Sequence, residues 1–238
     1  MANVNFPTNS SQKVQNLWNG DYALADEGGF FVTTNPTTGT AIAMTTSVVD
    51  DAATASSTHA QFAPVMIVFN SNTADNQNAA SIYLRYLRMQ IVQVPTSATS
   101  WKFSMRLDNT IRYASGGSTL IPVNLNPSSS RTSAAARVFF GAIVPAALPT
   151  AASRLVSNGQ VNSAVPVTLD QWLFSFGNAA PHMDLISGGA GAKNVTIACP
   201  PIVIPPGWSL SLGMWGASNA AAPSWEFEMG HVERVPGQ

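Results

Sequence analysis

Three stretches of the sequence alternate between apolar and polar residues, and they decide the fold class. They are Trp101-Lys102-Phe103-Ser104-Met105-Arg106-Leu107-Asp108, Trp208-Ser209-Leu210-Ser211-Leu212-Gly213-Met214 and Trp225-Glu226-Phe227-Glu228-Met229. A period of two places the apolar residues of a β-strand on one face. Each stretch therefore predicts a half-buried antiparallel strand, with one face on a core and the other toward solvent or a partner.

Short apolar runs between turn residues continue this pattern on both sides. With the strands around the three stretches (Ser100–Asp108, Trp208–Trp215 and Ser224–Val235), the predicted strands are Phe30–Thr34, Thr40–Val49, Pro64–Asn70, Ser81–Val94, Leu120–Leu125, Arg137–Val144, Asp170–Phe176 and Val195–Ile204. The alanine-containing segment Ser130–Val138 is the main helical candidate. About eleven short strands without a long amphipathic helix predict an all-β antiparallel sandwich, of the jelly-roll type, as one domain over residues 21–238.

The surface is predicted to be nearly neutral. Charged residues make up 10% of the chain and the formal net charge is −1, whereas soluble domains typically carry roughly 25% charged residues. Ser, Thr, Asn, Gln and Ala must therefore cover much of the surface. Few ions lose water when such a surface docks, so it suits a protein that packs against neighbours.

Basic residues form no cluster. The lysines are Lys13, Lys102 and Lys193, and the eight arginines are scattered. Binding to nucleic acid or to an anionic membrane needs clustered positive charge, so we expect neither partner. The first 30 residues lack a basic start followed by an apolar run, and no apolar run reaches ~18 residues. We therefore expect a protein that is made in the cytosol and is soluble there.

Residues 1–20 are polar and show no sustained period. Their large apolar side chains besides Met1 are Phe6, Leu17 and Trp18. We expect an extended arm that could reach ~65 Å and contact a neighbouring subunit through these three residues; a frayed terminus is the alternative. Trp215 is a further predicted contact residue, because it is out of register with the inward-facing Leu210 and Leu212.

Residues able to carry chemistry are few and dispersed. His59, His182 and His231 have no second histidine at metal-binding spacing, and nucleophile-elbow and phosphate-loop motifs are missing. The one cysteine, Cys199, lies in an apolar segment that predicts a buried strand end rather than a nucleophile. We therefore expect no catalytic residues, no cofactor and no metal site.

The last predicted strand contains two pairs of polar residues, each pair separated by one residue, and each could have a chemical or a merely structural role. His231 and Glu233 face the same side, roughly 6–7 Å apart at Cα, which allows a hydrogen bond or a coincidence. We expect His231 at the rim of the core. Glu226 and Glu228 could meet the ~5–9.5 Å separation of glycosidase carboxylates, but their placement on a polar face is better explained by solvation.

The C-terminal part of the chain resembles the closing hairpin of tailed-bacteriophage virion structural proteins. The resemblance lies in Ile-Val-Ile-Pro-Pro-Gly-Trp-Ser-Leu-Ser-Leu at 202–212 and Trp-Glu-Phe-Glu-Met-Gly-His-Val-Glu-Arg at 225–234. In that family a Pro-Pro-Gly turn, a strand, a loop and an aromatic strand close a jelly roll.

The resemblance implies a capsid decoration (cement) or minor structural protein, located in the virion and made in the host cytoplasm. Its partners would be further copies of itself, with a trimer favoured, and a major capsid protein. The alternative is a tail-associated receptor- or glycan-binding module that uses exposed aromatic residues. A coat protein of an icosahedral RNA virus is disfavoured, because residues 1–20 carry one lysine and no arginine.

Overall fold

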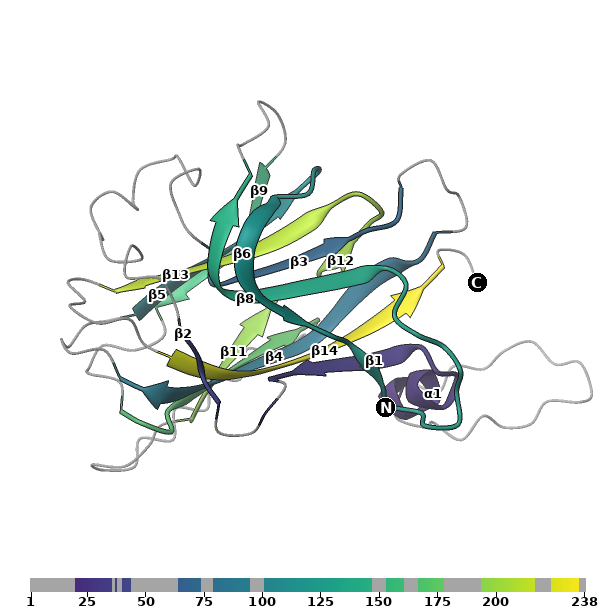
Figure 1. Ribbon diagram of the computed structural model, residues 1–238, viewed down its shortest axis with the longest axis horizontal. Coiled ribbons are helices and arrows are strands. Elements are labelled where there is room, and N and C mark those ends of the chain that lie inside the picture. The colour runs from purple at the N-terminus through teal and green to yellow at the C-terminus, as the bar shows by residue number, and fades with distance from the viewer. Residues whose placement is uncertain are drawn as a thin grey trace, which may run out of the picture.

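The computed structural model shows two β-sheets stacked as a sandwich, with one short helix, α1 (Gly20–Asp26), at one end of the described part (Figure 1). The residues that it describes are 20–35, 37, 40–43, 64–73, 79–94, 101–146, 153–160, 167–177, 194–216 and 224–235. The predicted all-β sandwich is confirmed. No helix in these ranges is long and apolar enough to cross a membrane.

The larger sheet contains eight of the described strands. Its main path runs β11-β10-β4-β14-β1-β7, while β12 pairs with β4 and β2 pairs with β14. All neighbours are antiparallel except β10 and β11. The strands are β1 (Phe30–Thr34), β2 (Ile42–Ala43), β4 (Ser81–Gln93), β7 (Val123–Asn124), β10 (Gln171–Phe176), β11 (Asn194–Cys199), β12 (Val203–Ile204) and β14 (Ser224–Arg234).

The smaller sheet contains six of the described strands in the order β6-β8-β3-β13-β5-β9, and all of its neighbours are antiparallel. Its strands are β3 (Met66–Asn70), β5 (Trp101–Asp108), β6 (Tyr113–Leu120), β8 (Ala136–Pro145), β9 (Ser153–Gln160) and β13 (Ser209–Gly216). The chain crosses between the two sheets repeatedly, as from β3 to β4, from β4 to β5 and from β13 to β14.

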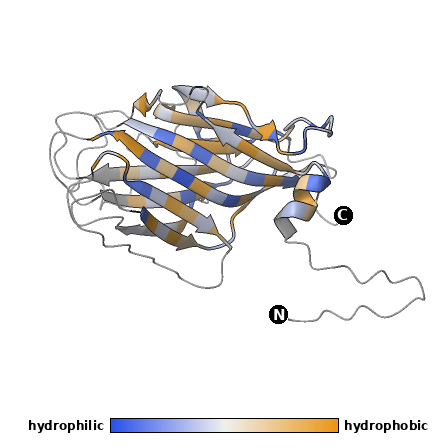
Figure 2. Cartoon of the chain, turned by 90° about the horizontal axis from the view of Figure 1, so that it is seen from below, coloured by the Kyte–Doolittle hydropathy of each residue, from blue (hydrophilic) through white to orange (hydrophobic). Residues whose placement is uncertain are grey.

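The core lies between the sheets and uses the predicted period-two register. Side chains that were expected to face inward are at most 3% exposed: Phe103, Met105, Leu210, Leu212, Trp225 and Phe227. The side chain of Trp101 lies outside the described residues. Ring contacts join the layers, with centroids of Phe140 and Phe227 4.2 Å apart and those of Phe103 and Phe174 5.0 Å apart. Hydrophobic and hydrophilic residues alternate along the strands (Figure 2).

A β-bulge lets strand β14 keep one face on the core over its whole length. Gly230 pairs with Tyr86 and His231 pairs with Leu84, so β4 contributes one extra residue, Arg85, at this point. Along β4 the inward residues therefore change from even to odd numbers, whereas on β14 they remain odd. As a result, His231 and Glu233 face the interior like the apolar residues before them.

Three predictions about local structure are wrong. Ser130–Val138 is not helical: it is a loop followed by the start of β8. The described helix is α1, where no helix was predicted. The cluster Ser115–Ser118 predicts a turn by its glycines and serines, but it lies within β6, where Gly116 and Gly117 take positive φ angles beside register shifts. Glycine adopts such angles without strain, so the strand bulges rather than ends.

Two further boundaries differ from the prediction. The predicted strand Leu120–Leu125 is divided, because Leu120 ends β6 in one sheet and Val123–Asn124 form β7 in the other. Strand β9 (Ser153–Gln160) was not predicted at all. Of the predicted strand Thr40–Val49, Ile42–Ala43 is a strand and the part from residue 44 lies outside the described residues.

Candidate functional site

A buried carboxylate, that of Glu233, joins the two sheets at one end of the sandwich. The side chain is on β14 and is 4% exposed. It accepts a hydrogen bond from the Ser133 hydroxyl and from the backbone N–H groups of Ala134, Ala135 and Ala136, at 3.1, 3.3 and 2.9 Å. These donors lie where the chain enters β8 of the other sheet. The alanine run is therefore held as a turn around an anion, which explains why it forms no helix.

His231 lies next to this carboxylate and is fully buried, with 0% exposure. The prediction of a rim position is wrong, because His231 continues the inward-facing row of Trp225, Phe227 and Met229 on β14 and is covered completely. The imidazole Nε2 is 3.6 Å from Glu233 Oε1, beyond hydrogen-bond length, and the ring stacks on Phe31 with centroids 5.6 Å apart. Neither ring nitrogen has a hydrogen-bond partner in the described part of the chain. The ring is therefore held by packing, with Phe31 as its stacking partner.

The order of these groups does not match nucleophilic catalysis. In a serine–histidine–acid triad the histidine stands between the hydroxyl and the carboxylate and takes the proton. Here the carboxylate of Glu233 stands between Ser133 and His231, and the serine hydroxyl donates to the carboxylate. The arrangement supports an anchor for the chain rather than activation of a hydroxyl.

The environment keeps Glu233 ionised. Burial by itself would raise the pKa of the carboxyl group, but the proximity of His231 and the hydrogen bonds from Ser133 and Ala136 outweigh it, and the pKa falls from 4.5 to about 2. A carboxylate with so low a pKa cannot supply a proton near neutral pH. It can, however, make the stability of the folded chain depend on pH.

We predict that acid removes the stabilisation that Glu233 provides. Its pKa is lower in the folded chain than in the unfolded chain, so the contribution is complete above about pH 4.5 and is lost as the pH falls toward 2. The loss should be on the order of 3 kcal/mol. Urea denaturation from pH 6 to pH 2 measures it, with Glu233→Gln as the control. The stability difference between wild type and this variant should shrink as the pH falls; a constant difference would contradict the prediction.

The second carboxylate pair, Glu226 and Glu228, lies half-buried on the outer face of the larger sheet. Glu228 accepts a hydrogen bond from the Tyr86 hydroxyl at 2.8 Å and pairs with Arg88 at 2.6 Å. Burial and this hydrogen bond raise the pKa of Tyr86 above its usual range. The Glu228 carboxylate thus has partners on the neighbouring strand β4, as expected for a solvated polar face.

The cysteine is buried, as predicted. Cys199 ends β11, is 3% exposed, and has its sulfur 3.7 Å from the Ser157 hydroxyl. Burial raises the pKa of the thiol, which opposes formation of the thiolate. Within the described ranges, no three His, Cys, Asp or Glu side chains are grouped to hold a metal ion.

The predicted contact residues are not brought together by the described part of the structure. Phe6, Leu17 and Trp18 lie outside the described residues, as do His59 and His182. The backbone of Trp215 lies on β13 opposite Lys102, but its side chain is outside the description. Sequence reasoning missed a different surface, the exposed aliphatic residues around β7. The sequence signal for this surface is the period-two spacing of Ile121, Val123 and Leu125. That spacing does not show whether the face that they share packs on the core or lies in solvent.

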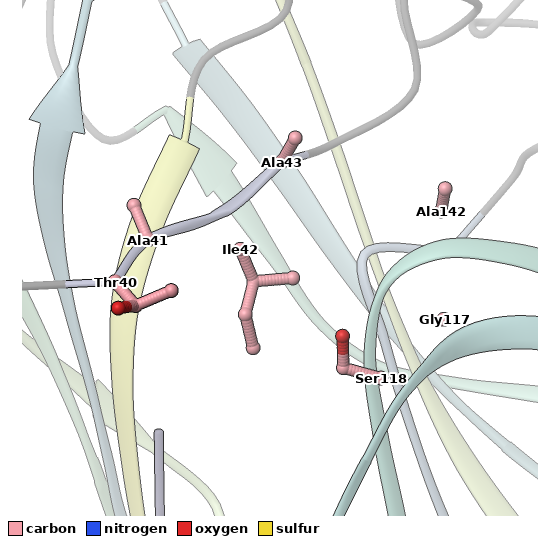
Figure 3. Close-up of a pocket in the computed structure, with 7 residues that line it drawn as sticks. All are labelled: Thr40, Ala41, Ile42, Ala43, Gly117, Ser118 and Ala142. Carbon is pink, nitrogen blue, oxygen red and sulfur yellow. The ribbon is translucent and has the colours of Figure 1, made fainter. Parts of the chain in front are cut away.

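A small cavity of about 330 Å³ opens between the edge strand β2 and the β6–β8 pair. Figure 3 shows the residues of the β2 side facing those of β6 and β8 across this space. The lining residues are small or aliphatic and uncharged: Thr40, Ala41, Ile42, Ala43, Gly117, Ser118 and Ala142. Pockets for small molecules usually add several convergent polar groups to an apolar lining.

Comparison with protein-family models, curated proteins and solved structures finds no match to this chain. The function is therefore inferred from the strand order, the buried groups and the surface chemistry of the chain itself.

Proposed function

We propose that this chain is a non-enzymatic structural protein of a virus particle. It acts as a capsid decoration (cement) protein, assembling as a homo-oligomer, with a trimer favoured, on the major capsid protein. The observation that carries the proposal is the pairing order of the strands.

Eight of the described strands pair as a hairpin that has been rolled up. Taken in chain order as β1, β3, β4, β5, β9, β10, β13 and β14, the first pairs with the last and the second with the second-to-last. The third pairs with the third-to-last, and the two middle strands pair with each other. Every pair is antiparallel. This nesting is the order of a jelly roll, so it supports the finer fold assignment that the sequence suggests.

Jelly rolls serve chiefly in viral capsids, in lectin domains and in cupins. A cupin needs a cluster of metal ligands, and the described ranges contain none. Sugar binding usually uses exposed aromatic rings, and Tyr22 is the only aromatic among the large hydrophobic residues exposed in the described part. The capsid role is favoured because a surface with few charges loses little hydration free energy when it is buried against neighbours.

The family resemblance supports the same choice. Its residues fall on β12, β13 and β14, and β14 is paired with both β1 and β4 in the centre of the larger sheet. The Pro-Pro-Gly turn before β13 is closed by a hydrogen bond from Trp208 N–H to the Pro205 carbonyl at 3.1 Å. The expected hairpin is not formed, because β13 pairs with β3 and β5 in the smaller sheet whereas β14 pairs with β1 and β4 in the larger one. What remains of the resemblance is the turn followed by two strands that lie on opposite sides of the core.

Mass spectrometry of density-gradient fractions tests the proposal. Virus particles purified from the culture that carries the gene should contain this chain in a fixed ratio to the major capsid protein through repeated gradients. Recovery of the chain only in the soluble fractions, with none in the particle band, would contradict a structural role.

A further inference from the structure

We propose that the turn of residues 133–136 is a carboxylate-binding site in its own right, and that Glu233 is the ligand that β14 supplies to it. The turn is called the carboxylate turn here. When the Glu233 carboxylate is removed, the turn keeps its shape and binds a free monocarboxylate such as acetate instead. This goes beyond the proposed function, since it concerns the chemistry of one site and holds whatever particle the chain belongs to.

The carboxylate turn offers two donors to each carboxylate oxygen. Oε1 of Glu233 accepts from the Ser133 hydroxyl and from the Ala136 N–H, the latter at 2.9 Å. Its Oε2 accepts from the N–H groups of Ala134 and Ala135 at 3.1 and 3.3 Å. Successive N–H groups that converge on one centre form a concave site for anions. Donors shared between two oxygens match a planar carboxylate better than a spherical anion.

The backbone of the carboxylate turn is fixed by groups other than Glu233. The Ser71 N–H donates to the Ala135 carbonyl at 2.8 Å, and the Ser71 hydroxyl lies 3.3 Å from the Ala134 carbonyl oxygen. A planar trans peptide directs its C=O and its N–H to opposite sides. Contacts that hold these two carbonyl groups therefore also direct the N–H groups of Ala135 and Ala136 at the site.

The ends of the turn are held independently as well. The methyl groups of Ala135 and Ala136 are fully buried in the main core, and Ala136 begins β8, which pairs with β3. Before the turn, Asn124 Nδ2 donates to the Arg131 carbonyl at 2.9 Å. None of these contacts involves Glu233. Since preorganised donors lose little conformational entropy on binding, the turn should also bind a carboxylate that is not attached to β14.

The surroundings of the site favour the charged form of a carboxyl group. His231 Nε2 lies 3.6 Å from Glu233 Oε1, and Arg131 Nη2 donates to the Glu233 backbone carbonyl at 3.5 Å. Despite burial, the pKa of Glu233 falls to about 2, because hydrogen bonds and His231 stabilise the anion. A neutral molecule of the same shape should therefore bind more weakly than a carboxylate.

Acetate is the probe that fits the space. Replacement of glutamate by alanine removes Cγ and the carboxylate group, which together make up the heavy atoms of acetate. Glu233 is 4% exposed, so their removal leaves a buried space rather than an open surface. Propionate carries one carbon more than this space, and acetamide has the shape of acetate without its charge.

Chemical rescue tests the inference. The Glu233→Ala variant is denatured with urea at pH 7 in increasing sodium acetate and, in parallel, in the same concentrations of sodium chloride. A ligand that binds only the folded chain stabilises it by mass action. Above the dissociation constant, each tenfold rise in acetate should therefore raise the ratio of folded to unfolded chain about tenfold. Propionate, acetamide and chloride should raise that ratio much less.

Two variants separate the site from a general effect of acetate. Trp225→Ala places a cavity elsewhere in the core, so it should respond to acetate only as wild type does, in which Glu233 fills the turn. Ser133→Ala, added to Glu233→Ala, removes the hydroxyl donor and should weaken acetate binding about tenfold. If Glu233→Ala is unfolded without additive, circular dichroism should show that acetate refolds it and chloride does not.

Three results would overturn the inference. A Glu233→Ala variant that gains no more from acetate than Trp225→Ala would mean that the turn binds no free carboxylate. An equal gain from acetate and chloride would mean that the site does not recognise a carboxylate. A Glu233→Ala chain that stays unfolded in acetate would mean that the turn depends on Glu233 for its shape.

Discussion

Replacement of Glu233 by alanine should lower the free energy of unfolding by about 3–5 kcal/mol, the range measured when one partner of a buried charged network is removed. The substitution deletes the acceptor for Ser133 and for three backbone N–H groups at the start of β8. Buried donors without acceptors each lose their hydration without compensation. Urea denaturation at pH 7, followed by tryptophan fluorescence, measures the change.

Two further variants show whether the effect belongs to the buried anion. Glu27→Ala changes an exposed glutamate at the end of α1 and should shift stability by less than about 0.5 kcal/mol. Glu233→Gln keeps the shape but supplies a single acceptor oxygen, so its loss should be intermediate. If Glu233→Ala is no less stable than Glu27→Ala, the carboxylate does not hold the two sheets together.

Trp225→Ala should also lower the free energy of unfolding by about 3–5 kcal/mol. Trp225 is fully buried, its ring lies 4.5 Å from that of Trp172, and its backbone pairs with Ile42 on one side and Ile91 on the other. Alanine would leave a cavity between the sheets that surrounding side chains fill only partly. The loss should appear in the denaturation midpoint without a large change in slope.

Matched substitutions define the size of this effect. Trp225→Phe retains a ring and should lose less than Trp225→Ala, while Tyr22→Ala removes an aromatic that is 69% exposed and should change stability by less than about 0.5 kcal/mol. Equal stabilities of Trp225→Ala and Tyr22→Ala would mean that Trp225 is not in the core.

The sheet core could be predicted from the sequence because burial on one face imposes a period of two. Phe103, Leu212 and Phe227 were assigned inward from that period alone, and all three are buried. Trp172 is less clearly placed by the sequence, because the apolar Leu173 follows it directly, yet it is 1% exposed and packs on Trp225.

Other features depend on tertiary contacts that no local pattern encodes. The period of two in β14 indicates that His231 faces inward, but its full burial depends on the packing around it. The bulge at Arg85 of the paired strand β4 likewise has no local signal in the sequence. The alanine run of 134–136 has high helix propensity, but hydrogen bonds to a glutamate nearly a hundred residues away take its N–H groups. Long-range partners therefore overrode local preference.

The candidate contact surface was only partly predictable. The sequence indicated a neutral surface suited to docking, because its composition has few charges. It placed the contacts at Phe6, Leu17, Trp18 and Trp215, whose side chains lie outside the described residues. The exposure of Ile121, Val123 and Leu125 could not be predicted, since it follows from the passage of the chain from β6 in one sheet to β7 in the other.

The location of the chain on a virus particle tests the central claim most directly. Antibodies raised against the purified chain, coupled to gold and applied to gradient-purified particles, show that location in the electron microscope. A capsid decoration protein predicts gold distributed over the surface of the head. Gold confined to the tail tip would favour the receptor- or glycan-binding alternative, and particles that carry no gold would contradict the structural role.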